Sequence, residues 1–148
     1  MIRIEARPFD PGAELAAFAD RVAGAGAMVS FTGLVRGQSD GAQVSGLELE
    51  HYPALTEKTI AAIGEEARKR FDLAGLAIVH RHGAMAPGDP IVFVAAAAEH
   101  RRAAFEAVDY MMDRLKTEAP FWKREQGPQG ARWIEARPAD LEDRARWG

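Results

Sequence analysis

The chain has 148 residues, the usual size of one domain, of which 47% are hydrophobic and 28% are charged. The formal net charge of −3 argues against a dedicated DNA-binding protein and against a polybasic membrane anchor. No cysteine is present, which excludes disulfides, thiolate metal ligands, a cysteine nucleophile and a persulfide carried on this chain. Because the chain shows neither a membrane-spanning apolar run nor a signal peptide, we expect a cytoplasmic protein.

The first half of the sequence predicts three strands and two helices. Alternating apolar and polar residues indicate half-buried strands, and apolar residues at helical spacing after a proline indicate helices. The expected elements are a strand over 1–8, a helix from 11 to about 24, a strand over 27–35, a polar glycine-rich loop over 36–46, a strand over 47–52 and a helix from 53 to about 71.

The second half predicts four strands around one long helix. Its elements are a strand over 76–80, a turn at 86–89, a continuously apolar strand over 91–98, a helix from 100 to about 118, a hairpin of 121–126 with 131–136, and a polar tail over 138–148. This order predicts one α+β domain over 1–148. We expect a mixed or antiparallel sheet with flanking helices, α/β hammerhead-like, plus a C-terminal β-hairpin subdomain.

Three consecutive basic residues, His100, Arg101 and Arg102, open the long predicted helix. The helix dipole already places partial positive charge there, so cations are unfavourable unless an anion lies nearby. A phosphate or carboxylate ligand is therefore one interpretation. The other is that these side chains point to water or pair with Glu99 and Glu106.

Lys116 and Lys123 flank the proline at which the long helix must end. A lysine beside apolar surface can have a lowered pKa and act as an acid, a base or a nucleophile. Lysines near a helix C-terminus are also ordinary dipole partners without a catalytic role. Both interpretations stay open on these residues alone.

The basic residues concentrate in one segment of this acidic chain. Residues 114–137 hold six Lys or Arg and three Glu, a charge of +3, so the rest of the chain carries −6. A local basic site on an acidic protein favours a small anionic ligand over a nucleic acid. Arg36, at the end of the strand FTGLVR, could bind a phosphate or carboxylate through both of its guanidinium nitrogens.

Other common site patterns are missing from the sequence. The glycine-rich loop lacks the Gly-Lys-Ser/Thr of a Walker motif, and neither HExxH nor Gly-x-Ser-x-Gly occurs. His80 and His82 share one face of a predicted strand, but structural roles suit them better than metal ligation. We therefore predict no metal site.

Five stretches resemble the family of molybdopterin synthase catalytic (large) subunits, the MoaE family. They are FTGLVR (31–36), LELEHYPALTEK (47–58), IVHRHGAMAPGD (78–89), EHRRAAFEAVDYMMDRLKTEAPFWKRE (99–125) and RWIEAR (132–137). They occur in the family's order over nearly the whole chain. The resemblance is weakest over 10–25, over 37–46 and after Pro138.

The resemblance implies a sulfurtransferase of molybdenum cofactor biosynthesis. Members convert cyclic pyranopterin monophosphate into molybdopterin by installing a dithiolene. The sulfur arrives on the C-terminal Gly-Gly thiocarboxylate of a small ubiquitin-like subunit, in a heterotetramer built on a homodimer of the large subunit. No cofactor of the chain itself is implied, and a chain without cysteine must receive its sulfur from such a partner.

The resemblance also assigns roles to particular residues. Lys116 and Lys123 should line the pocket that receives the thiocarboxylate, as catalytic groups, with Lys116 the more essential. Substrate binding is assigned to Arg36, His100, Arg101, Arg124, Glu125 and Arg137. Of these, Arg137 should reach a pocket across the dimer. Apolar lining or plain core remain alternatives for Phe31, Met112 and Phe121.

Two other functions fit the residues less well. A dimeric docking module for a ubiquitin-like protein would not need both lysines beside a basic anion site. A phosphate-ester enzyme with Lys116 as a Schiff-base lysine would give a stable adduct on borohydride trapping, whereas sulfur transfer would not.

Overall fold

The computed structural model describes residues 1–148 and is built on a four-stranded sheet in the order β1-β6-β8-β2. These strands are β1 (Ile2–Glu5), β6 (Gly75–Arg81), β8 (Pro90–Ala98) and β2 (Ala27–Leu34). β1 runs parallel to β6, whereas β8 is antiparallel to both β6 and β2. The predicted mixed sheet of an α+β fold is therefore confirmed.

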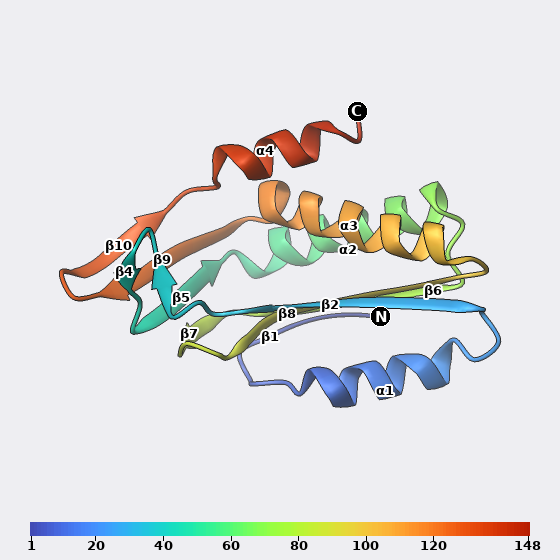
Figure 1. Cartoon of the computed structure of the whole chain (residues 1–148), viewed down its shortest axis with the longest axis horizontal. Helices are drawn as coiled ribbons and strands as arrows, with labels where there is room; N and C mark the ends of the chain where they lie inside the picture. Colours follow the sequence, from blue (N-terminus) through green and yellow to red (C-terminus); the bar gives the residue numbers. More distant parts are fainter.

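Helices cover both faces of this sheet (Figure 1). α2 (Pro53–Arg70) and α3 (Arg101–Glu118) lie on one face, and α1 (Pro11–Arg21) lies on the other. β8 is central and covered on both sides, so residues 92–98 are all buried, as their continuous apolar run predicts. α3 ends at Glu118 because Pro120 follows. No helix is both long enough and apolar enough to cross a membrane.

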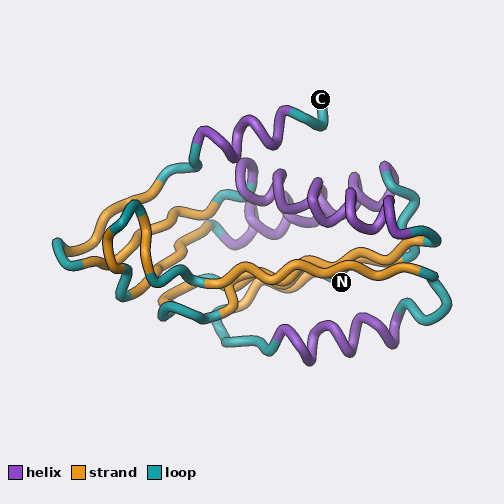
Figure 2. The backbone as a smooth tube through the Cα atoms, in the orientation of Figure 1, coloured by secondary structure: helices purple, strands orange, loops and turns teal.

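A second, antiparallel sheet lies at one end of the molecule (Figure 2). Its order is β10-β9-β5-β7, formed by β10 (Gly130–Ile134), β9 (Phe121–Gly127), β5 (Gly46–His51) and β7 (Gly83–Met85). The predicted C-terminal hairpin is present as β9 and β10. It is not a separate unit, because β9 also pairs with β5 along six residues, from Gly46 to His51.

Two segments differ from the sequence prediction. The predicted loop over 36–46 contains a small hairpin of β3 (Gln38–Ser39) and β4 (Ala42–Gln43). The predicted polar tail forms α4 (Pro138–Ala145), which packs along α3. Pro138 occupies the first turn of α4, and the Asp140 carboxylate accepts a hydrogen bond from the Arg137 backbone N–H at 3.2 Å.

Candidate active site

A pocket of about 760 Å³ opens where the two sheets, α3 and α4 meet. This volume is in the range of small-molecule sites, and half of the 26 lining residues are hydrophobic. The charged and titratable side chains in the lining are Arg36, Asp40, His80, Lys116, Lys123, Glu125, Glu135, Arg137 and Asp140. The pocket therefore combines apolar walls with convergent polar groups.

Local structure explains how the two lysines meet. Lys116 lies in the last turn of α3, on the side of the helix that faces the pocket. Lys123 lies on β9 opposite Leu49 of β5, and both side chains line the pocket because paired residues share one face of a sheet. Glu125, two residues further along β9, lies on the same face.

Burial is the largest influence on both lysines. It lowers the pKa of Lys116, and Arg36 and Arg137 lower it further, whereas the Asp140 carboxylate raises it. Burial likewise lowers the pKa of Lys123, followed by repulsion from Lys116, while Glu125 and Asp140 act in the opposite direction. Lysines held in this way give up a proton more readily than exposed lysines, as acid–base catalysis requires.

Two arginines contribute positive charge to the same pocket. Arg36 follows β2 and lines the pocket without a carboxylate partner. Arg137 precedes α4 and contacts the Asp140 carboxylate at 3.4 Å. Arg137 thus lines the pocket of its own chain, because α4 turns the chain back over α3. Its predicted reach to a pocket across a dimer stays a prediction.

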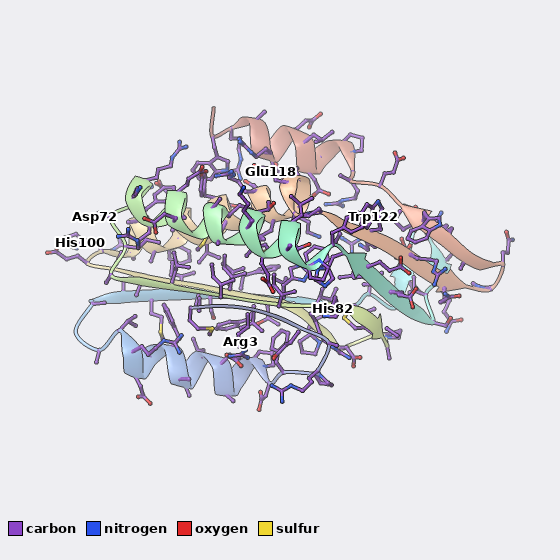
Figure 3. All side chains as sticks on the ribbon, turned by 180° about the vertical axis from the view of Figure 1, so that it is seen from behind. Arg3, Asp72, His82, His100, Glu118 and Trp122 are labelled. Carbon is purple, nitrogen blue, oxygen red and sulfur yellow. The ribbon has the colours of Figure 1, made fainter.

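His100 and Arg101 lie outside this pocket within the single chain, and their predicted role in substrate binding stays a prediction. They begin α3, whereas Lys116 is near its end, and 15 residues of helix separate Arg101 from Lys116 by about 22 Å. Figure 3 shows His100 at the end of the molecule away from Trp122 of β9. Both side chains are exposed, so the single chain leaves them without a ligand site.

Arg124 also lies outside the pocket, contrary to its predicted place in the wall. Successive side chains on β9 point to opposite faces of the sheet, so Arg124 points away from Lys123. Its guanidinium pairs with Glu48 and lies over the Trp133 ring, 5.2 Å from the ring centroid. These contacts fix a structural role on the outer face of the second sheet.

His80 lines the pocket although sequence reasoning gave it only a structural role. Its Nδ1 donates a hydrogen bond to the Arg81 carbonyl at 2.9 Å, and its ring stacks on Phe121 with centroids 4.1 Å apart. Burial lowers the pKa of His80 to about 4, so the ring is neutral. The alternation of side chains along β6 predicts a strand, but it does not predict which of its residues line a cavity.

Asp140 is the pocket residue that sequence reasoning missed most clearly. Its side chain is 12% exposed, pairs with Arg137 and lines the same pocket as the two lysines. A signal was present, since a proline followed by acidic residues is typical of a helix start. The prediction of a polar tail over 138–148 does not include the helix that begins at Pro138.

The fold and the pocket together define an α+β protein with a small-molecule site built around two lysines whose pKa values are lowered by partial burial. The family model for the MoaE protein matches residues 4–118. The chain belongs to this family, which confirms the resemblance. It is 50% identical to the molybdopterin synthase catalytic subunit of Cereibacter sphaeroides over 146 residues, or 99% of each chain.

Solved structures agree with this family assignment. The molybdopterin biosynthesis MoaE protein from Burkholderia ambifaria superposes with a TM-score of 0.84 at 47% identity, over 100% of this chain and 97% of that one. A complex of subunits 1 and 2 of molybdopterin-converting factor from Helicobacter pylori matches 93% of this chain and 90% of that one with a TM-score of 0.74. At 22% identity, this second match shows the fold alone.

Proposed function

We propose that the chain is the catalytic subunit of a molybdopterin synthase. It transfers sulfur from the C-terminal thiocarboxylate of a small ubiquitin-like subunit to cyclic pyranopterin monophosphate and so forms the dithiolene of molybdopterin. The observation that carries the proposal is the pocket that joins Lys116 and Lys123 with two arginines in a chain of this family. We place this reaction in the cytoplasm, a location that fractionation of tagged protein would test.

Lys116 and Lys123 are the proposed proton-transfer groups. Sulfur addition needs protons to move on and off the substrate, and a neighbouring ammonium stabilises negative charge on the oxygen of an attacked carbonyl. Their lowered pKa values suit both tasks, and each lysine can serve as the acid or as the base. Apolar lining from Phe31, Met112 and Phe121 limits water around them.

Arg36, Arg137 and Glu125 are the proposed substrate-binding residues within one chain. The free guanidinium of Arg36 suits the substrate phosphate, with Arg137 as a second cation. Glu125 is buried, and its Oε1 accepts no hydrogen bond in the protein, although an Arg132 guanidinium nitrogen lies 3.5 Å away. Such a carboxylate oxygen needs a donor, and the N–H groups of a pterin ring would supply one.

A second copy of the chain is the proposed source of His100 and Arg101 at each pocket. β2 is an edge strand of the main sheet, and its exposed apolar side chains are Met28, Phe31 and Leu34. Antiparallel pairing of two β2 strands would set the start of one against the end of the other. The first residue of β2 pairs with Ala98, which precedes His100 by two residues, and the last residue of β2 precedes Arg36 by two residues. This pairing would therefore bring His100 of one copy toward Arg36 of the other.

The proposed partners are therefore a second copy and a small ubiquitin-like subunit at each end, as a heterotetramer. The Helicobacter pylori structure is a complex of subunits 1 and 2 of molybdopterin-converting factor. The Gly-Gly tail of the small subunit would enter the pocket between Lys116 and Lys123.

Reconstitution tests the function directly. The purified chain is mixed with thiocarboxylated small subunit and cyclic pyranopterin monophosphate, and dithiolene formation is measured. We expect molybdopterin only when all three components are present. Conversion at the same rate with a small subunit that ends in an ordinary carboxylate would contradict the proposal.

A further inference from the structure

The C-terminal helix α4 connects the pocket with a cluster of contacts outside it. Its N-terminal end, with Arg137, Pro138 and Asp140, lines the pocket that Lys116 also lines. Beyond its other end is Trp147, whose indole Nε1 donates a hydrogen bond to the Asp113 carboxylate of α3 at 2.7 Å. Figure 1 shows α4 beside the C-terminal part of α3. One short helix therefore links a pocket residue to a contact that does not line the pocket.

Several contacts fix the far end of α4 on the protein. The Arg146 guanidinium pairs with Asp113 at 2.6 Å and with Asp109 at 3.1 Å, and Arg144 pairs with Glu118 at 2.9 Å. The Trp147 ring packs edge-on against Phe71 and Tyr110, with centroids 6.0 and 5.4 Å apart. Arg70 also donates to the Trp147 carbonyl at 3.1 Å. We call the set of Asp113, Arg146 and Trp147 the C-terminal anchor.

The charges around Lys116 make Asp140 distinctive. Three cations line the pocket around Lys116: Arg36 after β2, Lys123 on β9 and Arg137 before α4. The neutral ring of His80 lines it from β6. Among the acids of the lining, Asp40 and Glu125 both pair with Arg132, and Glu135 is exposed. Asp140 is 12% exposed and pairs with Arg137, and it is the acid whose charge acts on Lys116.

We propose that Asp140 is a positioning residue for Lys116, supplying the counter-charge of the pocket, and that the C-terminal anchor holds it there through α4. This inference rests on the proposed role of Lys116 and extends it to residues that touch neither substrate nor partner tail. Without Asp140, the pocket would keep its cations and lose an enclosed negative charge. Without the anchor, α4 would keep few contacts that hold Asp140 beside Lys116.

The test measures the protonation of Lys116 without any substrate, so it does not depend on sulfur transfer. Trace acetic anhydride labels the lysines of the intact chain across a pH series, and peptide mapping gives the midpoint at which Lys116 becomes reactive. Lys58, exposed on α2, serves as the internal reference for reagent reactivity.

Asp140→Asn should move the Lys116 midpoint to lower pH by about one unit, because an opposite charge nearby favours the ammonium. Asp140→Glu should restore a midpoint close to the original. Glu142→Gln, which neutralises an exposed acid on the same helix, should leave it unchanged. An unchanged midpoint in Asp140→Asn would overturn the counter-charge role.

A variant of the anchor tests the second half of the proposal. Trp147→Ala should shift the Lys116 midpoint in the same direction as Asp140→Asn, and the double variant should shift it no further than Asp140→Asn alone. In the reconstituted reaction, the part of the pH–rate profile that depends on Lys116 should shift by the same amount as the midpoint of Lys116 acetylation. The substitution should change kcat more than KM. A Trp147→Ala chain with a lower Tm but an unchanged midpoint would show the anchor to be structural only.

Discussion

At the scale of single residues, a shared pocket separates the two candidate catalytic lysines from the other basic side chains. Lys116 and Lys123 line one pocket and are partly desolvated there, whereas the Arg102 side chain, at the other end of α3, is 87% exposed. Taking an ammonium partly out of water disfavours its charge, lowers its pKa and so makes its proton easier to transfer. The sequence shows where the lysines lie in the chain, but their burial depends on strands far away in it.

Replacing Lys116 tests the catalytic assignment. Lys116→Ala should lower the rate of dithiolene formation about 10²- to 10⁴-fold, the usual contribution of a proton-transfer group. Binding of the small subunit should persist, because the rest of the pocket is intact. The measurement is the reconstituted rate together with a titration of the small subunit. A native rate in this variant would refute the assignment.

His80 makes the stability of the fold depend on pH. Its folded-state pKa of about 4 lies below the ordinary value of 6.5, so the unfolded chain binds the proton more readily. The stability that this neutral ring contributes is complete above pH 6.5 and is lost as the pH falls toward 4. Urea unfolding at pH 7.5 and pH 5 should show a smaller difference in His80→Gln than in the unchanged chain. An equal difference in both would argue against this origin.

At the scale of elements, the sequence predicts those helices and strands whose position depends on the local pattern of apolar residues and prolines. The buried strand β8 follows from its apolar run, and the end of α3 follows from Pro120. It does not predict that β5 pairs with both β9 and β7, since strand pairing is a long-range property. For this reason the sequence does not show that Arg124 and Arg101 lie outside the pocket of the single chain. Each has the residue type that the site needs but lies on another face or at another end.

The edge strand β2 leads to a prediction about two copies of the chain. Arg101→Ala and Lys116→Ala should each be inactive alone, while mixed dimers of the two should regain activity. One of the two pockets in a mixed dimer would receive both Arg101 and Lys116 unaltered. Coexpression with different tags, purification of the mixed dimer and the reconstituted assay would measure this. Mixed dimers as inactive as the separate variants would place Arg101 outside the shared site.

At the scale of the whole molecule, the chain holds a site but no thiol. It contains no cysteine, and its net charge of −3 coexists with a segment of +3 over 114–137 that supplies both lysines and Arg137 to the pocket. Such a protein can bind and orient an anionic substrate and a carrier tail. The sulfur atoms must then pass from the carrier to the substrate without a thiol of this chain as intermediate.

Following labelled sulfur tests this account most directly. A small subunit carrying ³⁵S in its thiocarboxylate is mixed with the chain and cyclic pyranopterin monophosphate, and the label is located after a single turnover. The account predicts radioactivity in the pterin product and none covalently attached to this chain. Label bound to this chain, or none in the pterin, would contradict it.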